Sequence, residues 1–109
     1  MYKLTLLDKV HVLPGPIRRR VDQYNYVVIL LDNKVIGINE NVIVFDGLTG
    51  AKLWQVDTSI VENHKLGPYS PFVNVDFNSD GNLSLSNFGG WKVILDPRNG
   101  KELAYEFTK

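Results

Sequence analysis

Residues 41–55 read NVIVFDGLTGAKLWQ, and this stretch decides the fold. An apolar strand runs into Asp46, a tight turn follows at Thr49 and Gly50, and a second strand carries Trp54. Aspartate and threonine side chains accept hydrogen bonds from backbone donors in turns, and glycine adopts positive φ at no steric cost. The aromatic side chain suits packing between neighbouring sheets. The stretch therefore predicts a β-hairpin in which all four residues have structural roles.

The same pattern returns near the C-terminus, where residues 91–107 read WKVILDPRNGKELAYEF. Asp96 stands where the first stretch has Asp46, and Gly100 stands where it has Gly50, so both receive the same turn roles. A pattern that recurs at a fixed period indicates copies of one structural unit. We therefore expect two similar β-units.

Short runs rich in β-branched and aromatic residues predict strands along the chain. The turns between them are too short for crossover helices, so consecutive strands are expected to pair antiparallel. The chain divides into N-terminal strands with a proline-rich loop, a first four-stranded meander, a loop and a second four-stranded meander, at residues 1–23, 24–57, 58–71 and 72–109. The predicted strands within these segments are 2–7, 9–13, 24–31, 34–38, 42–45, 51–56, 72–77, 83–86, 91–95 and 101–107.

The two meanders differ in their hydrophobic pattern. In the second, apolar residues alternate with polar ones, so one face of that sheet is expected to meet water. The strands of the first are apolar on both faces and need cover on both sides. We expect the second meander to cover one side and the N-terminal strands the other, through Tyr2, Leu4, Leu6, Val10 and Val12. The predicted fold is one compact all-β domain over residues 1–109, packed as a sandwich or barrel. If the N-terminal strands pack elsewhere, the uncovered face predicts a homo-oligomer.

The repeats resemble blades of β-propellers. VIVFDGLTGAKLW (residues 42–54) is similar to the repeat of quinoprotein-type propellers, in which an aspartate ends the third strand and Thr-Gly-x-x-x-Trp follows. VDFNSDGNLSLSNFGGWKVILDPRNGKEL (residues 75–103) resembles WD40-like bacterial blades. Asn99 replaces the threonine in this copy, and Tyr105 is the aromatic nearest to the missing tryptophan.

The resemblance implies that the turn motif is scaffold and that any ligand site lies in variable loops. It brings no quinone cofactor, because two blades cannot close a ring. A fragment of a longer propeller, an assembly of several copies and a self-contained pair of sheets are the three possibilities, and the facing pattern favours the last.

A candidate metal site lies in residues 76–87. Asp76, Asn78, Asp80 and Asn82 place oxygen donors at alternating positions around a glycine, as in the first part of a calcium loop. An asparagine stands where such loops have a bidentate glutamate, and the flanking segments read as strands instead of helices. A hairpin turn rich in Asx residues explains the same pattern, and both interpretations stay open.

Composition excludes several classes of function. The chain has 109 residues, no cysteine, and 12 basic against 12 acidic residues. Disulfides and thiolate sites are therefore excluded, and no global field favours nucleic acid or membrane. The three arginines at residues 18–20 are either a small anion contact or a solvated strand face. The longest apolar run, residues 27–31, is too short to span a bilayer, and no signal peptide is recognised, so a cytoplasmic location is the default.

Catalytic signatures are missing from the sequence. His11 and His64 lie in different contexts, and there is neither a GxSxG motif nor a glycine-rich nucleotide loop. We therefore predict no catalytic residue and no cofactor. The leading hypothesis is a non-catalytic module that binds another protein, with its working surface at the second meander and residues 57–71. The alternatives are a small-ligand or calcium-binding domain, a subunit of an assembled propeller, and an enzyme whose site forms only on assembly.

Overall fold

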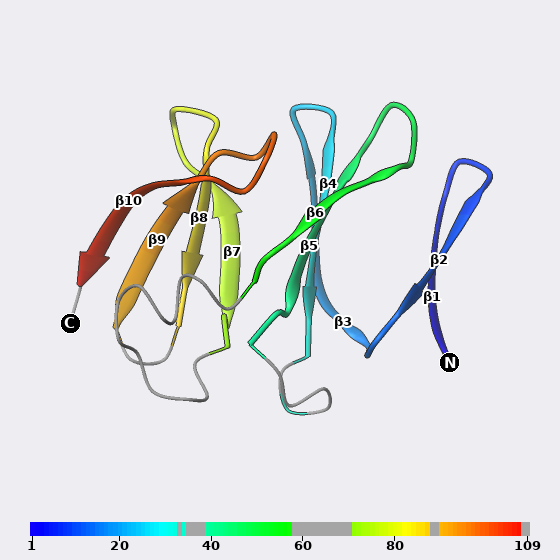
Figure 1. Ribbon diagram of the computed structural model, residues 1–109, viewed down its shortest axis with the longest axis horizontal. Coiled ribbons are helices and arrows are strands. Elements are labelled where there is room, and N and C mark those ends of the chain that lie inside the picture. Colours follow the sequence, from blue (N-terminus) through cyan, green and yellow to red (C-terminus); the bar gives the residue numbers. More distant parts are fainter. Residues whose placement is uncertain (33, 35–38, 58–70, 88–89, 108–109) are drawn as a thin grey trace.

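Three antiparallel β-layers stacked face to face make up the computed structural model (Figure 1), which describes residues 1–32, 34, 39–57, 71–87 and 90–107. The N-terminal hairpin consists of β1 (Tyr2–Leu6) and β2 (Lys9–Leu13). The first sheet consists of β3 (Ile17–Gln23), β4 (Tyr26–Leu31), β5 (Val42–Asp46) and β6 (Lys52–Gln55). The second sheet consists of β7 (Asn74–Phe77), β8 (Leu83–Ser86), β9 (Trp91–Leu95) and β10 (Glu102–Phe107). Both sheets are four-stranded meanders, as predicted. Within the described ranges, no helix is long and apolar enough to cross a bilayer.

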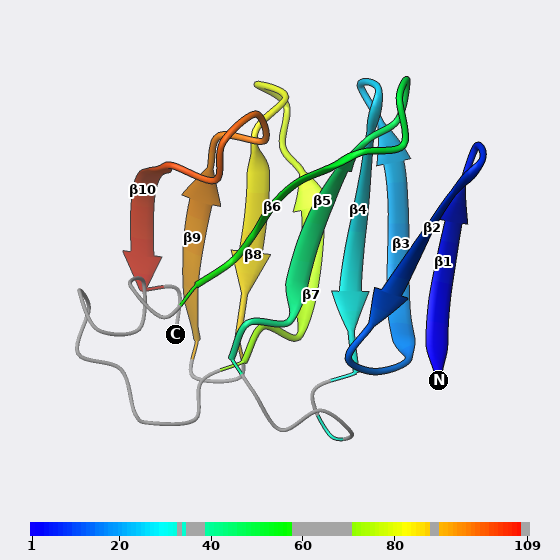
Figure 2. The ribbon, with the colours of Figure 1, turned by 45° about the vertical axis from the view of Figure 1, so that its right-hand side comes forward.

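The first sheet lies in the middle, and both of its faces are buried (Figure 2). Successive side chains of a strand point to opposite faces, so β4 and β5 each supply two separate apolar clusters. The cluster between the two sheets contains Val28, Leu30, Val42, Val44, Val56, Phe72, Val75, Leu83, Leu85, Trp91, Val93 and Leu95. The cluster under the N-terminal hairpin contains Leu4, Leu6, Leu13, Val27, Ile29, Leu31, Ile43 and Phe45. The two-sided cover predicted for the first meander is therefore confirmed.

The hairpin covers the first sheet with fewer residues than the sequence predicted. Leu4 and Leu6 are buried as expected, but Tyr2, Val10 and Val12 are 45%, 58% and 65% exposed. The two valines alternate along β2 with the residues that face the first sheet, so they point away from it. Tyr2 begins the first strand, where little of the chain surrounds it.

The first sheet begins at Ile17, whereas the sequence predicted its start at Tyr24. β3 pairs with β4, and Tyr24 and Asn25 form the two-residue turn between them with φ of 54° and 63°. Two-residue hairpin turns use positive φ, which asparagine tolerates better than most residues. A strand at the edge of a sheet is half exposed, so the charged residues of β3 concealed it from an analysis based on apolar alternation.

The strand predicted at residues 34–38 falls almost entirely outside the described residues. Its predicted place beside residues 24–31 is nevertheless taken, because β4 pairs with β3 on one edge and directly with β5 on the other. The four strands of the first meander are therefore β3, β4, β5 and β6.

The outward face of the second sheet is polar, which confirms the predicted wet face. The strand registers align β4 with β8, β5 with β9, and β6 with β10. At most positions where the first sheet points apolar side chains at the second sheet, the second sheet has smaller or polar ones: Val28 corresponds to Ser84, Leu30 to Ser86, Val42 to Lys92 and Trp54 to Ala104. Ile94, which corresponds to Val44, is apolar. Lys92 forms an ion pair with Glu106 on this face, with 3.6 Å between Nζ and Oε2. No strand of the described residues forms a further layer on this face.

A fully buried asparagine joins the two sheets. Asn41 precedes β5, and its amide oxygen accepts a hydrogen bond of 3.0 Å from the backbone N–H of Phe72. Its amide nitrogen donates to the Phe72 carbonyl at 2.7 Å and lies 3.4 Å from the Leu31 carbonyl. Buried polar groups are stabilising only when they are paired, and here the pairing satisfies both sheets.

We expect Asn41→Ala to lower the free energy of unfolding by about 2–4 kcal/mol, because it leaves the buried N–H and C=O of Phe72 unpaired. The matched control is Asn74→Ala on the exposed face of the second sheet. This substitution should change the free energy of unfolding by less than about 0.5 kcal/mol. Chemical denaturation of both variants measures the difference. Equal losses would contradict the role assigned to Asn41.

Candidate functional site

The turn motif of the two repeats makes the local contacts of a structural turn. Oδ1 of Asp46 accepts a hydrogen bond of 2.8 Å from the backbone N–H of Leu48, and Oδ1 of Asp96 accepts one of 2.9 Å from that of Arg98. The Thr49 hydroxyl oxygen lies 3.3 Å from the N–H two residues further on. These side chains are occupied by the backbone of their own turns.

A backbone carbonyl in each of these two turns accepts a hydrogen bond from a ring N–H of the preceding layer, which is the hairpin for the first sheet and the first sheet for the second. The Nε2 of His11 lies 2.7 Å from the Gly50 carbonyl oxygen, and the indole N–H of Trp54 donates to the Pro97 carbonyl at 2.7 Å. A carbonyl only accepts, so Nε2 of His11 carries the hydrogen. Gly100, with φ of 77°, is required because a Cβ there would lie 2.7 Å from the Trp54 ring. The two contacts clamp all three layers at their turn ends.

Two of the four donors of the candidate calcium loop, Asp76 and Asn78, are engaged within the protein. One carboxylate oxygen of Asp76 lies 3.3 Å from Nη2 of Arg19, and the other accepts the N–H of the next residue. Oδ1 of Asn78 accepts the N–H groups of Asp80 and Asn82, each at 3.0 Å. In the part of the chain that the structure describes, no three His, Asp or Glu side chains form a metal-binding group. These contacts are those of an Asx-rich hairpin turn.

Millimolar calcium is therefore expected to leave the melting temperature unchanged. A site occupied at a hundred times its Kd would add about 2.7 kcal/mol, which a thermal melt resolves easily. Magnesium at the same concentration is the control for ionic strength. A rise specific to calcium that disappears in Asp80→Asn would restore the calcium hypothesis.

An ion pair within the second turn lowers the pKa of Asp96. Asp96 is nearly buried, and Nη2 of Arg98 lies 2.8 Å from its carboxylate. The side-chain hydrogen bond from Arg98, followed by the backbone one, lowers the pKa of Asp96 to about 2. A carboxylate whose pKa is lower in the folded state stabilises the fold above its unfolded pKa, and this stabilisation is lost as the pH falls toward the folded pKa.

We expect the melting temperature of the protein to fall between about pH 4 and pH 2 as Asp96 becomes protonated. Asp96→Asn keeps an acceptor for the turn N–H but removes the charge, so its melting temperature should fall less over the same range. Thermal melts across this pH series measure the contrast. Parallel curves for both proteins would contradict the assignment.

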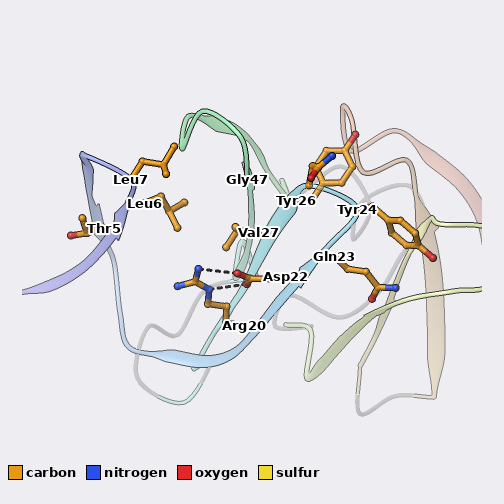
Figure 3. A pocket seen from close by; sticks show the side chains of 11 residues that line it. Thr5, Leu6, Leu7, Arg20, Asp22, Gln23, Tyr24, Tyr26, Val27 and Gly47 are labelled. Atoms are coloured by element: carbon orange, nitrogen blue, oxygen red, sulfur yellow. Dashed lines mark hydrogen bonds and ion pairs between the residues drawn. The ribbon is translucent and has the colours of Figure 1, made fainter.

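A groove of about 480 Å³ lies between the N-terminal hairpin and the turn that joins β3 to β4 (Figure 3). Leu6 and Leu7 line it from the end of β1 and its turn, and Val27 lies at the start of β4. Arg20 and Asp22 line it from β3, with Nε–Oδ1 and Nη2–Oδ2 distances of 2.8 and 2.9 Å. The two charges neutralise each other, so the groove is apolar at one side and carries a paired, neutral polar group at the other.

The arginine triplet at residues 18–20 does not form a single basic patch. Neighbouring residues of a strand face opposite ways, so Arg19 reaches the second sheet while Arg20 faces the groove. Arg19 donates to the Val75 carbonyl at 3.1 Å and Arg20 pairs with Asp22. The spacing of Arg20 and Asp22, two apart on one strand, is the signal that could have predicted their pairing.

Leu7 is the unusual residue at the rim of this groove. It has φ of 56° and is 67% exposed. A bulky side chain rarely adopts positive φ, and an exposed leucine contributes little to the fold. Local sequence patterns do not predict this groove, because it depends on where the hairpin lies over the first sheet. His64 and most of the segment 57–71, where a working surface was expected, lie outside the described residues.

A family model described as Domain of unknown function (DUF7957) matches residues 2–107, which include all three layers. No curated protein matches the sequence. The family description names no propeller, so the resemblance of residues 42–54 and 75–103 to propeller blades stays a prediction.

Proposed function

The chain belongs to a family of unknown function, DUF7957, and from this premise we propose that it is a non-catalytic protein-interaction module that binds its partner at the end formed by the N-terminal hairpin. The observation that carries the proposal is the contrast between the two ends of the stack. One end is a completed, polar sheet face, and the other is an incomplete layer with exposed apolar side chains.

The hairpin end exposes more apolar surface than its two strands need for folding. Leu7, Val10 and Val12 are all more than half exposed there. Leu48, which is 68% exposed, follows the groove-lining Gly47 in the next turn. Large exposed apolar side chains that gather at one place are typical of interaction surfaces, whereas single ones are ordinary.

The chemistry around the groove supports binding more than catalysis. Its two charged side chains, Asp22 and Arg20, are paired with each other, and the ring nitrogen of His11 that faces the next layer is occupied by a backbone carbonyl. A general acid or base has to exchange a proton with a substrate, whereas these charged side chains are engaged with each other.

A photo-cross-linking amino acid placed at two positions tests the proposal in cells that naturally make the protein. Lys3 is exposed on the hairpin, and Ser84 lies on the polar face of the second sheet. We expect the probe at Lys3 to link to a specific protein and the probe at Ser84 to give only background. Links of equal yield from both positions, or links from Ser84 alone, would contradict the proposed surface.

A further inference from the structure

The two strands of the N-terminal hairpin correspond to two of the four strands of the first sheet, β5 and β6. The hairpin's β2 sends His11 onto the Gly50 carbonyl and β6 sends Trp54 onto the Pro97 carbonyl, so each ring reaches the corresponding turn of the next layer at a different residue. The hairpin therefore occupies the position that β5 and β6 have in the complete first sheet. In the complete sheet, β4 follows on the other edge of β5. The corresponding place beside β1 holds no strand of the described chain.

The free edge of β1 presents unpaired backbone groups at defined residues. Leu7 and Asp8 form a two-residue turn, so the flanking pair Leu6 and Lys9 exchanges both hydrogen bonds. The pairs along the hairpin then alternate, and Thr5, which lies opposite Val10, turns its N–H and C=O away from β2. Lys3 does the same, two residues earlier.

The groove lies beside this edge, above the outermost strand of the first sheet. Thr5, Leu6 and Leu7 form one of its walls, and Arg20 and Asp22 of β3 lie across from them (Figure 3). The hairpin has only two strands over a sheet of four, so no strand of the described residues lies above this part of the first sheet. An unpaired strand edge beside such a groove is a template for another strand.

We propose that an extended segment of a partner protein adds to the free edge of β1 as a third strand and fills this groove. This inference deepens the proposed function and rests on it. The backbone of the segment pairs with Lys3 and Thr5, which gives affinity, and its alternate side chains enter the groove, which gives specificity. Leu7, held in a strained conformation at the rim, contacts the segment directly.

The groove also restricts what the segment can be. Side chains that point inward meet Leu6 and Val27 near the tip of β1 and the paired Arg20 and Asp22 further along β3. Apolar residues suit the first position. Uncharged hydrogen-bonding residues suit the second, because a charged side chain would have to compete with a bidentate ion pair. The partner segment is thus extended, apolar at one inward position and neutral at the next.

A second copy of this chain fits less well than an isolated segment. Antiparallel pairing of β1 with the β1 of another copy places both first sheets on the same side of the joined hairpins. That side is already occupied by β3 of this chain, which carries Arg20 and Asp22 under the vacant position. An extended segment brings no such layer with it.

Two proline variants of the full chain provide the test. Thr5→Pro removes the N–H on the free edge of β1 and places a ring in the path of an added strand. Val10→Pro is the matched control, because Val10 lies directly opposite and its N–H points to the other edge. Neither change removes a hydrogen bond within the hairpin. The probe is a displayed library of short random peptides, selected against the unaltered protein.

We expect selected peptides to bind the unaltered protein and Val10→Pro equally, and to bind Thr5→Pro at least about tenfold more weakly. Leu7→Gly, which relieves the strained turn while removing the side chain, should also weaken binding if the proline variant does not fold. Amide exchange at Lys3 and Thr5 should slow when peptide is bound to the unaltered protein, and exchange at Val10 should not.

Peptides that bind Thr5→Pro undiminished, protection at Val10 instead of Thr5, or a selection that yields no binder would overturn the strand-addition inference. Dimerisation of the unaltered protein that Thr5→Pro abolishes would assign the edge to a second copy and also overturn it. The proposed function survives each of these results if the probe at Lys3 still links to a partner protein, so the two failures are distinguishable.

Discussion

The first sheet cannot leave either of its faces in water, and the rest of the structure depends on this constraint. Val28 and Val44 point one way along their strands, and Ile29 and Ile43 point the other. Apolar surface on both faces requires two covering layers. The second sheet and the N-terminal hairpin are those layers, and the three pack as one unit because neither cover alone would bury the middle layer.

The layers are held in register by one device used twice. A ring N–H from one layer binds a carbonyl in the turn of the next, through His11 at Gly50 and through Trp54 at Pro97. The position that Trp54 fills in the first sheet is Ala104 in the second, and no strand of the described chain packs beyond it. The contacts are therefore directional, since the ring N–H comes from the earlier layer in both cases, and the second sheet has no ring at the position of Trp54.

Sequence patterns predicted what alternation and turn chemistry control. The two meanders, the wet face and the cover by Leu4 and Leu6 followed from apolar spacing alone. β3 was missed because the charged residues of this edge strand do not show the apolar alternation of a strand. Val10 was placed inward because two apolar residues do not determine the register of a hairpin. The groove depends on how far a two-stranded layer covers a four-stranded one, which is a tertiary property that no local pattern contains.

The polar outward face of the second sheet determines how this architecture can grow. A layer added after β10 would have to bury Ser84, Ser86 and the ion pair of Lys92, and their desolvation would oppose its packing. Additional sheets are accepted only before the hairpin or between the two existing sheets, where apolar faces meet. The outward face of the second sheet thus has the polar character of a capping repeat in solenoid proteins, and an added layer is easier to accommodate on the N-terminal side of that sheet.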